Sequence, residues 1–398
     1  MIDVMSLASQ QFDYAVQARR YVHTHPELSG KEENTVRFIC EKLDAEGIPY
    51  VNVPNGGVIA TIQGKEGGKT VMLRGDIDAL PIEETDNNLK GPRVCKSENP
   101  GVMHACGHDA HTAMLLTAGK ILNQLKEQFT GTVLLNFERG EEGGGNYAYL
   151  IDYYKKSGLK FDSCFGMHVE QKMDSGTFGI NPGPANAGAM RINLLIKGRG
   201  GHGSRPDLSH NPMDCMLNVL NQIQGIRMNT ISPFEQLTVT ICKIVGGTAA
   251  NIIPDEVEVF GTARYFSEEK VRKPFMAQLQ RICDTAGAAY DCEIINRGAT
   301  GGAMTLINDE ACALLARDTA AKVLPAGSLC DMQVTMGSES FGNYFEIGPG
   351  CYGNLGVRNP QVGSGAEIHN CYFDIDEEAM KTGISMHVGY ALNFLKAL

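Results

Sequence analysis

The densest group of chemistry-bearing residues in this 398-residue chain is the segment HACGHDAH at residues 104–111. Imidazole and thiolate are ligands that zinc and other first-row transition metals prefer. The segment therefore predicts a metal site that includes Cys106 and His108. Asp109 is expected to accept a hydrogen bond from a ligand imidazole and to orient it. A polar turn that caps the following helix is the alternative interpretation.

Two acidic pairs add to this cluster. Glu141 and Glu142 precede three glycines, which would let the backbone approach a site closely. Adjacent carboxylates can divide their roles, because one can bind a metal while the other takes a proton from water. Asp76 and Asp78, in RGDIDALP, are expected to support metal ligands through hydrogen bonds. Each pair alone is also typical of a solvated turn or a loop cap.

Two isolated histidines complete the candidate donor set. His168 follows an apolar run, and His369 lies in AEIHN. Each histidine alone is typical of a packed or solvent-contacting side chain. Taken together, the nitrogen, oxygen and sulfur donors suffice for two metal ions that share a water. The candidate ligands are Cys106, His108, Glu142, His168 and His369.

The segments that must position these residues alternate between strand and helix patterns. The strands are expected at about 56–64, 70–80 and 130–140, and the helices at about 7–25, 31–47 and 112–129. Most candidate residues follow a strand, and sites in open α/β sheets gather where strands end. The order predicts an α/β domain with a mostly parallel sheet flanked by helices.

The pattern changes between residues 187 and 298. Alternating strands and two helices follow the order β-α-β-β-α-β, which predicts an inserted α+β domain of ferredoxin-like topology. We therefore expect a metal-binding domain at 1–186 and 299–398, with the insertion at 187–298. The insertion carries His202 in a glycine-rich loop, Asn251 in a turn and Arg264 in a strand. Arginine pairs with carboxylates through two hydrogen bonds, so Arg264 could bind an anionic substrate or serve only as a surface residue.

Composition narrows the class of protein. A formal charge of −11 argues against broad attachment to nucleic acid or anionic lipid. No apolar run is long enough for a transmembrane helix, and the N-terminus lacks the basic and apolar segments of a signal peptide. The 12 cysteines form no CxxC pair, which favours free thiols in a reducing cytoplasm.

These motifs, in this order, resemble the binuclear metallo-amidohydrolases of the zinc-peptidase-like carboxypeptidase superfamily. That family includes hippurate hydrolase, bacterial aminoacylases, auxin-conjugate hydrolases and N-acetyl-diaminopimelate deacetylase. The resemblance covers nearly the whole chain. The motifs that carry it are HACGHDAH, RGDIDALP, EEGGG, GGHGS, ANIIPDEVEVFGTAR, MGSESF and EIHN.

The resemblance implies an enzyme that hydrolyses the amide bond of N-acyl amino acids or related conjugates. Two divalent metal ions (zinc, manganese, cobalt or nickel) would bind to the five candidate ligands, with Glu141 as general base. His202 would stabilise the oxyanion in the site of a partner subunit, and Asn251 with Arg264 would hold the substrate's α-carboxylate. The inserted domain would act as a lid and form a homodimer.

The chain departs from the family pattern near the expected site. Ser340 stands in MGSESF where relatives usually carry Asp, which removes an acidic group. Glu138-Arg139-Gly140 stand where relatives usually read Gln-Pro-Ala, and the residues after His202 also differ. These positions shape the substrate pocket, so they bear on substrate choice.

Three alternatives stay open at this point. A metallo-exopeptidase that acts on dipeptides would use the same residues. A catalytically silent homologue would bind metal and ligand without turnover. A cysteine hydrolase would use Cys106 as nucleophile with His108, although two residues so close in a loop suit shared metal ligation better.

Overall fold

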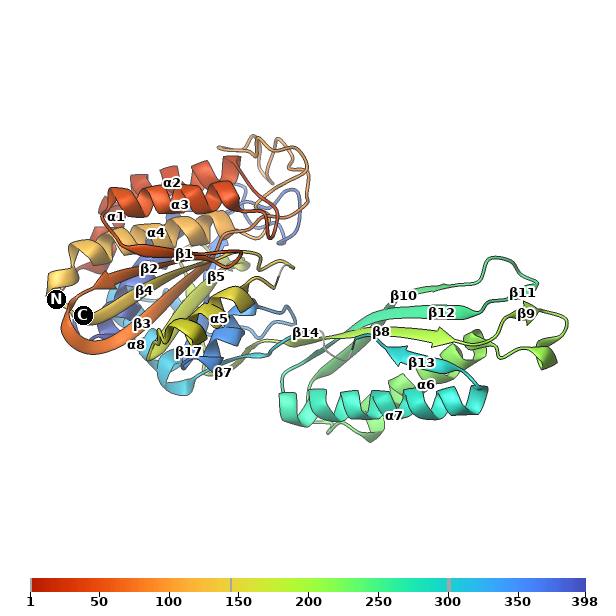
Figure 1. Cartoon of the computed structure of the whole chain (residues 1–398). Coiled ribbons are helices and arrows are strands. Elements are labelled where there is room, and N and C mark those ends of the chain that lie inside the picture. The colour runs from red at the N-terminus through yellow and green to blue at the C-terminus, as the bar shows by residue number, and fades with distance from the viewer. Residues whose placement is uncertain (1, 144, 299–301) are drawn as a thin grey trace. The chain divides into compact units, whose positions relative to one another are not determined.

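The computed structural model describes residues 2–143, 145–298 and 302–398. The chain forms two compact units (Figure 1). The first comprises Met1–Ala185, Ile307–Gln333 and Ser340–Leu398, and the second comprises Asn186–Leu306 and Val334–Glu339. The second unit thus takes in a short segment that lies far along the chain from the rest of it. The expected boundary at residue 299 lies outside the described residues.

The first unit is built on a mixed sheet with a parallel centre. In the described residues its strand order is β1 (Tyr50–Val53), β2 (Gly57–Gln63), β4 (Thr130–Glu138), β3 (Lys65–Asp76), β5 (Ser163–Asp174), β17 (Gly350–Arg358), β6 (Phe178–Gly179) and β16 (Leu329–Cys330). The four central strands, from β4 to β17, all pair in parallel, and antiparallel pairs occur toward both edges. The predicted mostly parallel sheet is confirmed.

Helices flank this sheet (Figure 1), so its central strands are buried almost continuously instead of alternating. The helices of the first unit are α1 (Val4–Gln10), α2 (Phe12–Thr24), α3 (Glu33–Ala45), α4 (His108–Gln124), α5 (Tyr147–Ser157), α8 (Glu310–Val323) and α9 (Met380–Phe394). The helix predicted at 7–25 is wrong in its extent, because the chain bends at Gln11 and forms two helices there.

Helix α4 begins earlier than the sequence pattern predicted. It starts at His108, because Gly107 adopts a left-handed conformation with φ of +82° and turns the chain into the helix. A side chain at Gly107 would also collide with Val169, since its Cβ would lie 2.4 Å from Val169 Cγ2. The glycine therefore allows close approach of the HACGHDAH motif to β5.

The second unit has the predicted β-α-β-β-α-β order. Its elements are β8 (Gly188–Lys197), α6 (Pro212–Asn229), β10 (Leu237–Gly246), β12 (Glu256–Tyr265), α7 (Lys273–Tyr290) and β13 (Glu293–Asn296). The strands pair antiparallel in the order β10-β12-β8-β13, and β14 (Gly302–Ala303) also pairs with β8. Asn211 caps α6 by accepting from the N–H of Met213, and Pro212 occupies the first helical position. Both helices bury their apolar faces against this sheet.

The remaining short elements lie in connections. They are η1 (Lys126–Gln128), β7 (Gly183–Asn186), β9 (Gly201–His202), η2 (Pro206–Leu208), β11 (Ile252–Ile253), η3 (Glu268–Arg272), β15 (Leu306–Asn308), η4 (Ser340–Glu346) and η5 (Glu377–Ala379). Among the described helices, none combines the length and apolar character that crossing a membrane requires.

Candidate metal centre

The candidate ligands of the first unit come from neighbouring elements of its sheet. His108 is the first residue of α4, Cys106 lies in the loop just before this helix, and Glu142 follows the end of β4. His168 lies within β5, so the prediction that it follows a strand is wrong. His369 comes from the loop between β17 and α9, where its N–H donates to the carbonyl of Ala105 at 2.8 Å. That hydrogen bond joins the His369 loop to the HACGHDAH motif.

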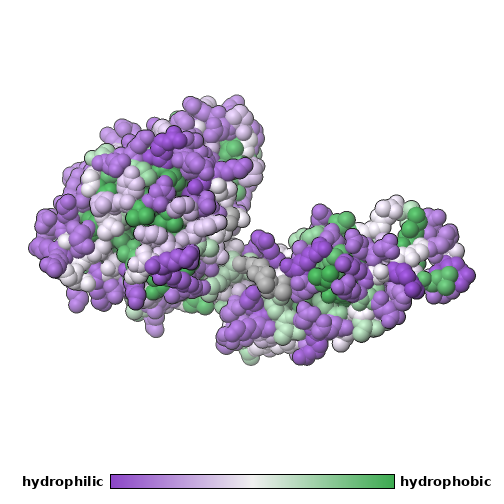
Figure 2. All heavy atoms as spheres, in the orientation of Figure 1, coloured by the Kyte–Doolittle hydropathy of each residue, from purple (hydrophilic) through white to green (hydrophobic). Residues whose placement is uncertain are grey.

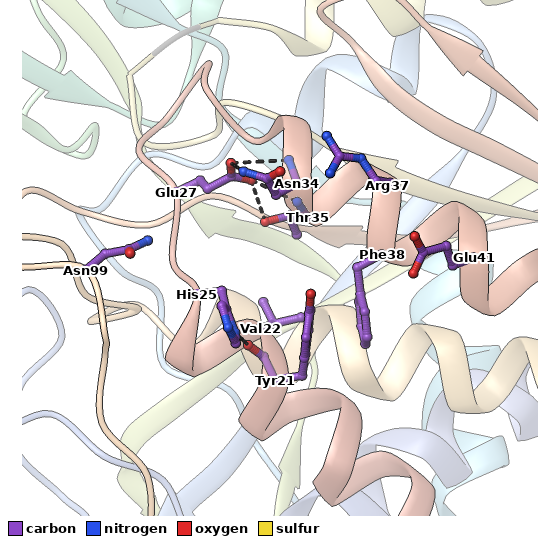
Figure 3. Close-up of a pocket in the computed structure, with 10 residues that line it drawn as sticks. All are labelled: Tyr21, Val22, His25, Glu27, Asn34, Thr35, Arg37, Phe38, Glu41 and Asn99. Atoms are coloured by element: carbon purple, nitrogen blue, oxygen red, sulfur yellow. Dashed lines mark hydrogen bonds between the residues drawn. The ribbon is translucent and has the colours of Figure 1, made fainter.

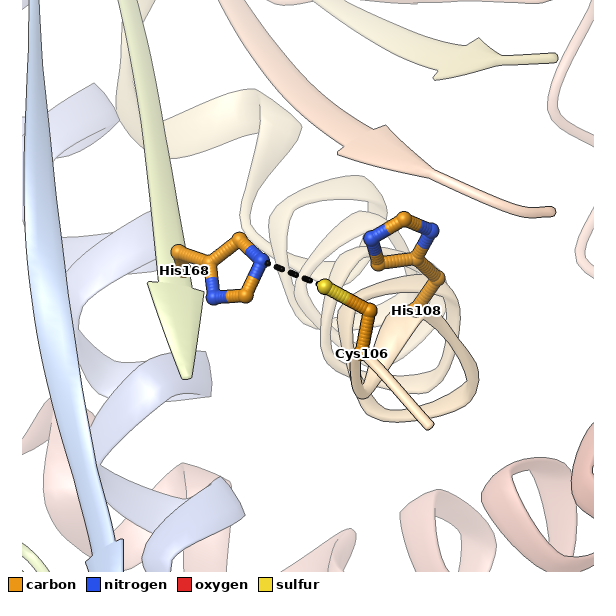
Figure 4. A group of neighbouring side chains, drawn as sticks. All are labelled: Cys106, His108 and His168. Carbon is orange, nitrogen blue, oxygen red and sulfur yellow. Dashed lines mark hydrogen bonds between the residues drawn. The ribbon is translucent and has the colours of Figure 1, made fainter. Parts of the chain in front are cut away.

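These side chains converge in two overlapping groups. In the first, Cys106, His108 and His168 point toward one another, and Cys106 Sγ lies 3.3 Å from His168 Nε2 (Figure 4). The second comprises Cys106, Glu142 and His369, with Glu142 Oε1 3.1 Å from His369 Nε2. In each group the potential ligand atoms lie within 4.8 Å of one another. The structure therefore brings all five candidate ligands together, and Cys106 belongs to both groups.

The donor chemistry of His108 fits a bound cation. Its Nε2 is buried and has no hydrogen-bond partner among the described residues, while its Nδ1 bonds to Asp78 Oδ1 at 3.0 Å. A metal-bound histidine characteristically ligates through one nitrogen and donates to a carboxylate through the other. Burial opposes charge on His108, but Asp76, Cys106 and Asp78 outweigh it and hold its pKa well above the ordinary value. Carboxylates that favour a proton there also favour a metal cation.

The other ligands show complementary electrostatics. Burial raises the pKa of the Cys106 thiol well above its ordinary value, so a lone thiolate is unfavourable there and a cation would offset this cost. A hydrogen bond that His369 donates to the Glu142 carboxylate raises the pKa of His369. The side chain of His369 is 48% exposed whereas that of Glu142 is 9% exposed. The donor group is thus buried at Glu142 and open to solvent at His369.

The three aspartates expected to support the ligands have different partners. Asp78 accepts from His108 and from the N–H of Glu142 at 2.9 Å, so it contacts two candidate ligands. Asp76 accepts from Arg74 Nη1 at 2.7 Å and from His111 Nδ1 at 2.5 Å. Asp109 Oδ2 accepts from Arg19 Nε at 2.7 Å and His23 Nδ1 at 2.8 Å. It belongs to a buried ion-pair network with α2, and the expectation that it orients a ligand imidazole is corrected accordingly.

His111 has a positioning role that the sequence reasoning missed. Its Nδ1 donates to Asp76, and its Nε2 accepts from the N–H of Val169 at 3.0 Å. The imidazole therefore bridges the end of β3 and the residue after His168 on β5. His111 follows His108 by three residues, a spacing that places both rings on one face of a helix. This spacing could have identified His111 as part of the site from the sequence.

Glu141 lies beside the ligands without belonging to either of the two overlapping groups. One of its carboxylate oxygens lies within 4.8 Å of donor atoms of His108 and Glu142. Its Oε1 accepts a hydrogen bond from the N–H of Ser340 at 3.0 Å. A carboxylate held there can exchange a proton with a reacting group at the metal centre. Gly144, in the glycine run that follows, lies outside the described residues.

The second unit carries the other three candidate residues. His202 and Asn251 lie together in it, and Arg264 lies apart from them. His202 on β9 pairs with Ile252 on β11, and the N–H of Gly203 donates to the carbonyl of Asn251 at 2.8 Å. His202 and Asn251 are therefore neighbours. Arg264 lies at the other end of β12, roughly 27 Å along the strand from Glu256. Figure 1 shows β9 and β11 at the end of this unit opposite to β14, beside which Arg264 lies.

A separate surface hollow lies between α2 and α3 (Figure 3). It has a volume of about 310 Å³, and a stack of Tyr21 on Phe38, with ring centroids 4.2 Å apart, forms part of its wall. Glu27 accepts hydrogen bonds from Asn34 and Thr35 within it, so these polar groups already have protein partners. None of the candidate metal ligands lines this hollow.

The chain is similar to proteins named as a carboxypeptidase and as an amino acid hydrolase, and to the structure of a dinuclear metal-binding peptidase. It is 34% identical to thermostable carboxypeptidase 2 of Saccharolobus solfataricus over 96% of this chain and 95% of the relative. It is 33% identical to an IAA-amino acid hydrolase of Arabidopsis thaliana, over 97% and 87% respectively. The crystal structure of a dinuclear metal-binding peptidase of the M20 family from Bacillus subtilis matches with a TM-score of 0.80 and 28% identity, over 98% of this chain and 100% of that chain.

The family model of peptidase family M20/M25/M40 matches residues 72–393. That span begins on β3, ends in α9 and contains every candidate ligand described above. The relatives cover nearly the whole chain as well. The chain is therefore a member of peptidase family M20/M25/M40.

Proposed function

We propose that the protein is a metal-dependent amidohydrolase that cleaves the amide bond of N-acyl amino acids or related conjugates. The observation that carries this proposal is the convergence of five nitrogen, oxygen and sulfur donors beside a separate carboxylate, Glu141. Membership of a peptidase family and similarity to a protein named as an IAA-amino acid hydrolase support the same reaction class.

Two divalent metal ions fit the donor set. One would be held by Cys106, His108 and His168, and the other by Cys106, Glu142 and His369. When bound, such ions lower the pKa of water toward neutrality and polarise the substrate carbonyl. Cys106 would serve both ions. Asp78 would keep the Nδ1 proton of His108 in place and so direct Nε2 toward the metal.

Glu141 is the proposed general base. It would remove a proton from the attacking water, which adds to the amide carbon as hydroxide. When the carbon–nitrogen bond breaks, Glu141 would return the proton to the departing nitrogen, so that a carboxylate and a free amine result. Its hydrogen bond from Ser340 fixes one carboxylate oxygen next to the ligands.

The second unit would supply the groups that bind the substrate. His202 is the proposed donor to the tetrahedral oxyanion, and Asn251 and Arg264 are the proposed partners of the α-carboxylate. In one chain Asn251 and Arg264 lie at opposite ends of β12, too far apart to hold one carboxylate. We infer that His202 and Asn251 of one subunit act together with Arg264 of another. A homodimer follows from this arrangement.

A surface suited to such a dimer lies on the second unit. β10 is an edge strand of its sheet and exposes Ile244 and Val245. Figure 2 shows apolar residues over β10 and at the end that carries β9 and β11. Helix α6 and the loop after it add Met228 and Phe234, which are 85% and 95% exposed. An exposed edge with apolar neighbours is open to pairing with a second copy.

We also propose that the protein acts in the cytoplasm. All 12 cysteines are free, and several are buried as small apolar side chains. A reducing compartment would keep the Cys106 thiol available to bind metal. Retention of both metals in reducing buffer, and their loss on oxidation, would support this location.

The hydrolase is tested by amine release from a panel of N-acetyl, N-benzoyl and longer N-acyl amino acids, with manganese or zinc added. We expect turnover that a chelator abolishes and that metal restores. In Glu141→Ala, turnover should fall by roughly 10²–10⁴-fold, while metal content is unchanged. A metal-loaded Glu141→Ala protein with wild-type turnover would refute the role of Glu141. If no substrate of the panel is cleaved although metal is bound, the result would favour a homologue that binds metal and ligand without turnover.

A second candidate function is a metallo-exopeptidase, because the chain is similar to a protein named as a carboxypeptidase. The two activities differ in whether the acyl side of the scissile bond carries a free amine. Rates on an N-acetyl amino acid and on the matching dipeptide separate them. We expect the N-acetyl substrate to be cleaved faster.

The dimer is tested by mixing two inactive variants. Co-expression of Glu141→Ala and His202→Ala chains gives mixed dimers, half of the total, in which one of the two sites has both residues intact. We expect about a quarter of wild-type activity if His202 acts in the partner's site. Activity no higher than that of the two variants measured separately would exclude this exchange.

A further inference from the structure

Ser340 lies directly beside the proposed general base. Its N–H donates to Glu141 Oε1, and the residue itself is only 6% exposed. It is also the point at which the chain returns to the first unit, since Val334–Glu339 belongs to the second. Whatever fixes Ser340 therefore fixes the hydrogen bond to Glu141.

The side chain of Ser340 is clamped between two buried charges. Arg74 Nη2 donates to the Ser340 hydroxyl at 2.7 Å, and the hydroxyl in turn donates to Glu138. Arg74 Nε also donates to Glu138 at 3.1 Å, which closes a triangle of three side chains. Arg74 and Glu138 are 1% and 0% exposed. A hydroxyl suits this place because it accepts from the guanidinium and donates to the carboxylate at the same time.

The sheet fixes this triangle. Arg74 is on β3 and Glu138 is the last residue of the neighbouring parallel strand β4. Their register pairs Asp76 with Glu138, so the two residues that bind Arg74 lie side by side. Asp76 continues the network to His111, and through it to Val169 next to His168. One guanidinium thus anchors both the donor to Glu141 and the strand that carries His168.

The triangle also explains a departure seen in the sequence. The family pattern that the sequence resembles led us to expect Asp at the position of Ser340 and Gln at the position of Glu138. The expectation that an acidic group near the site is lost does not hold, because the Glu138 carboxylate binds both Arg74 and Ser340. The negative charge opposite Arg74 is retained on β4.

We propose that Ser340 is a positioning residue for Glu141, clamped by Arg74 and Glu138, and that Glu138 supplies the carboxylate expected at position 340 from the sequence resemblance. This inference rests on the proposed role of Glu141 as general base. Ser340 acts through its backbone N–H, which orients the Glu141 carboxylate, and its side chain holds that N–H in place. Its effect is therefore on the chemical step, without a direct contact to the substrate.

The first experiment compares Ser340→Ala with Ser340→Thr and with the matched control Ser163→Ala. Ser163 is also buried, and its hydroxyl bonds to Tyr390 in the same unit, away from Glu141. We expect Ser340→Ala to lower kcat by about 10- to 100-fold, with KM and metal content unchanged. Ser340→Thr keeps the hydroxyl and should recover most of the activity. Ser163→Ala should change thermal stability without this loss in kcat.

Two results would overturn the inference. Wild-type kcat in Ser340→Ala would show that Glu141 needs no such anchor. A loss of kcat matched by loss of metal, or equally large in Ser163→Ala, would show a merely structural role. Glu141→Ala is measured in parallel. If Glu141→Ala is inactive while Ser340→Ala is fully active, the positioning inference fails and the proposed function stands.

The role of Glu138 is tested by moving its carboxylate from position 138 to position 340. Glu138→Gln alone should lower kcat to an extent similar to Ser340→Ala, because Arg74 loses one of its carboxylate partners. Adding Ser340→Asp returns a carboxylate to Arg74, so the double variant should be more active than Glu138→Gln. Ser340→Asp alone is measured as well. If the fold-loss of kcat in the double variant equals the product of the fold-losses in Glu138→Gln and Ser340→Asp, the two positions act independently, and the replacement of one carboxylate by the other is contradicted.

Discussion

The metal centre and the end of the second unit that carries His202 are built in different ways. At the metal centre, His108 is held by Asp78, and His168 lies on β5, where the N–H of the next residue, Val169, donates to His111. His108, Asp78 and His111 are buried, and His168 is half-buried. In the second unit, His202 is exposed, and its Nδ1 accepts from Ser204 within the same loop. Ligands need a fixed geometry before the metal arrives, whereas a residue proposed to reach another subunit, as His202 is, must stay on the surface.

The largest expected effect tests whether the metal centre is one shared cluster. Cys106 belongs to both donor groups and His369 to one of them. Cys106→Ala should lose both metals and lower kcat by more than roughly 10³-fold, whereas His369→Ala should lose one metal. Metal content per subunit and turnover are measured together. Equal metal loss in the two variants would contradict a shared thiolate.

The next effect concerns the second unit. His202→Ala should lower kcat by roughly 10²–10³-fold, as loss of an oxyanion donor does. Metal content and thermal stability should stay at wild-type levels, because the side chain is exposed and bonds only to Ser204 in the described hydrogen-bond network. If metal is lost with the activity, His202 belongs to the metal centre and the contrast between the two regions disappears.

A smaller effect separates two aspartates of the first unit. Asp78→Asn should weaken metal binding by about 10- to 100-fold, because Asp78 contacts His108 and Glu142. Asp109→Asn is the matched control. It should leave metal affinity close to wild type but lower the free energy of unfolding, since Arg19 and His23 lose their carboxylate partner. Metal titration and denaturant unfolding measure the two effects, and the reverse pattern would restore the original expectation for Asp109.

The smallest effect is a pH dependence of stability. Burial and Arg19 lower the pKa of His23, but hydrogen bonds with Asp109 and Glu84 outweigh them and raise it to about 8. The protonated form thus stabilises the fold below the unfolded-state pKa of about 6.5, and this contribution is lost as the pH rises through about 8. We expect the free energy of unfolding to fall by about 2 kcal/mol across this range.

This pH dependence is measured by denaturant unfolding at saturating metal. His23→Gln should be less stable at pH 6.5 and should lack the dependence. If the free energy of unfolding of His23→Gln depends on pH as in the wild type, another group causes the dependence. The ion-pair network of His23 and Asp109 would then not be its source.

The sequence determined much of the architecture. Hydrophobic periodicity located most strands and helices, and the order β-α-β-β-α-β identified the inserted fold, because local pattern and chain order carry that information. Boundaries were less certain. The bend at Gln11 and the start of α4 at His108 depend on backbone conformation and packing, which the apolar pattern does not record.

The candidate site was likewise predictable from the sequence only in part. Residue types and motif order indicated the five donors and Glu141 before their distances were known. The partners of Asp109 were not predictable, because a carboxylate next to a ligand in sequence can face the other side of a helix turn. There it meets Arg19 and His23 from α2, which lie 90 and 86 residues away along the chain.

The three histidines of HACGHDAH show what the sequence alone determined and what only the tertiary structure decided. Their types and spacing predicted a metal site. Burial lowers the pKa of His104 to about 4 and leaves its ring without a hydrogen-bond partner in the described structure. His108 directs a nitrogen toward the other donors, and His111 joins two strands. The three rings are chemically identical, so only the groups packed around each one could give it a different role.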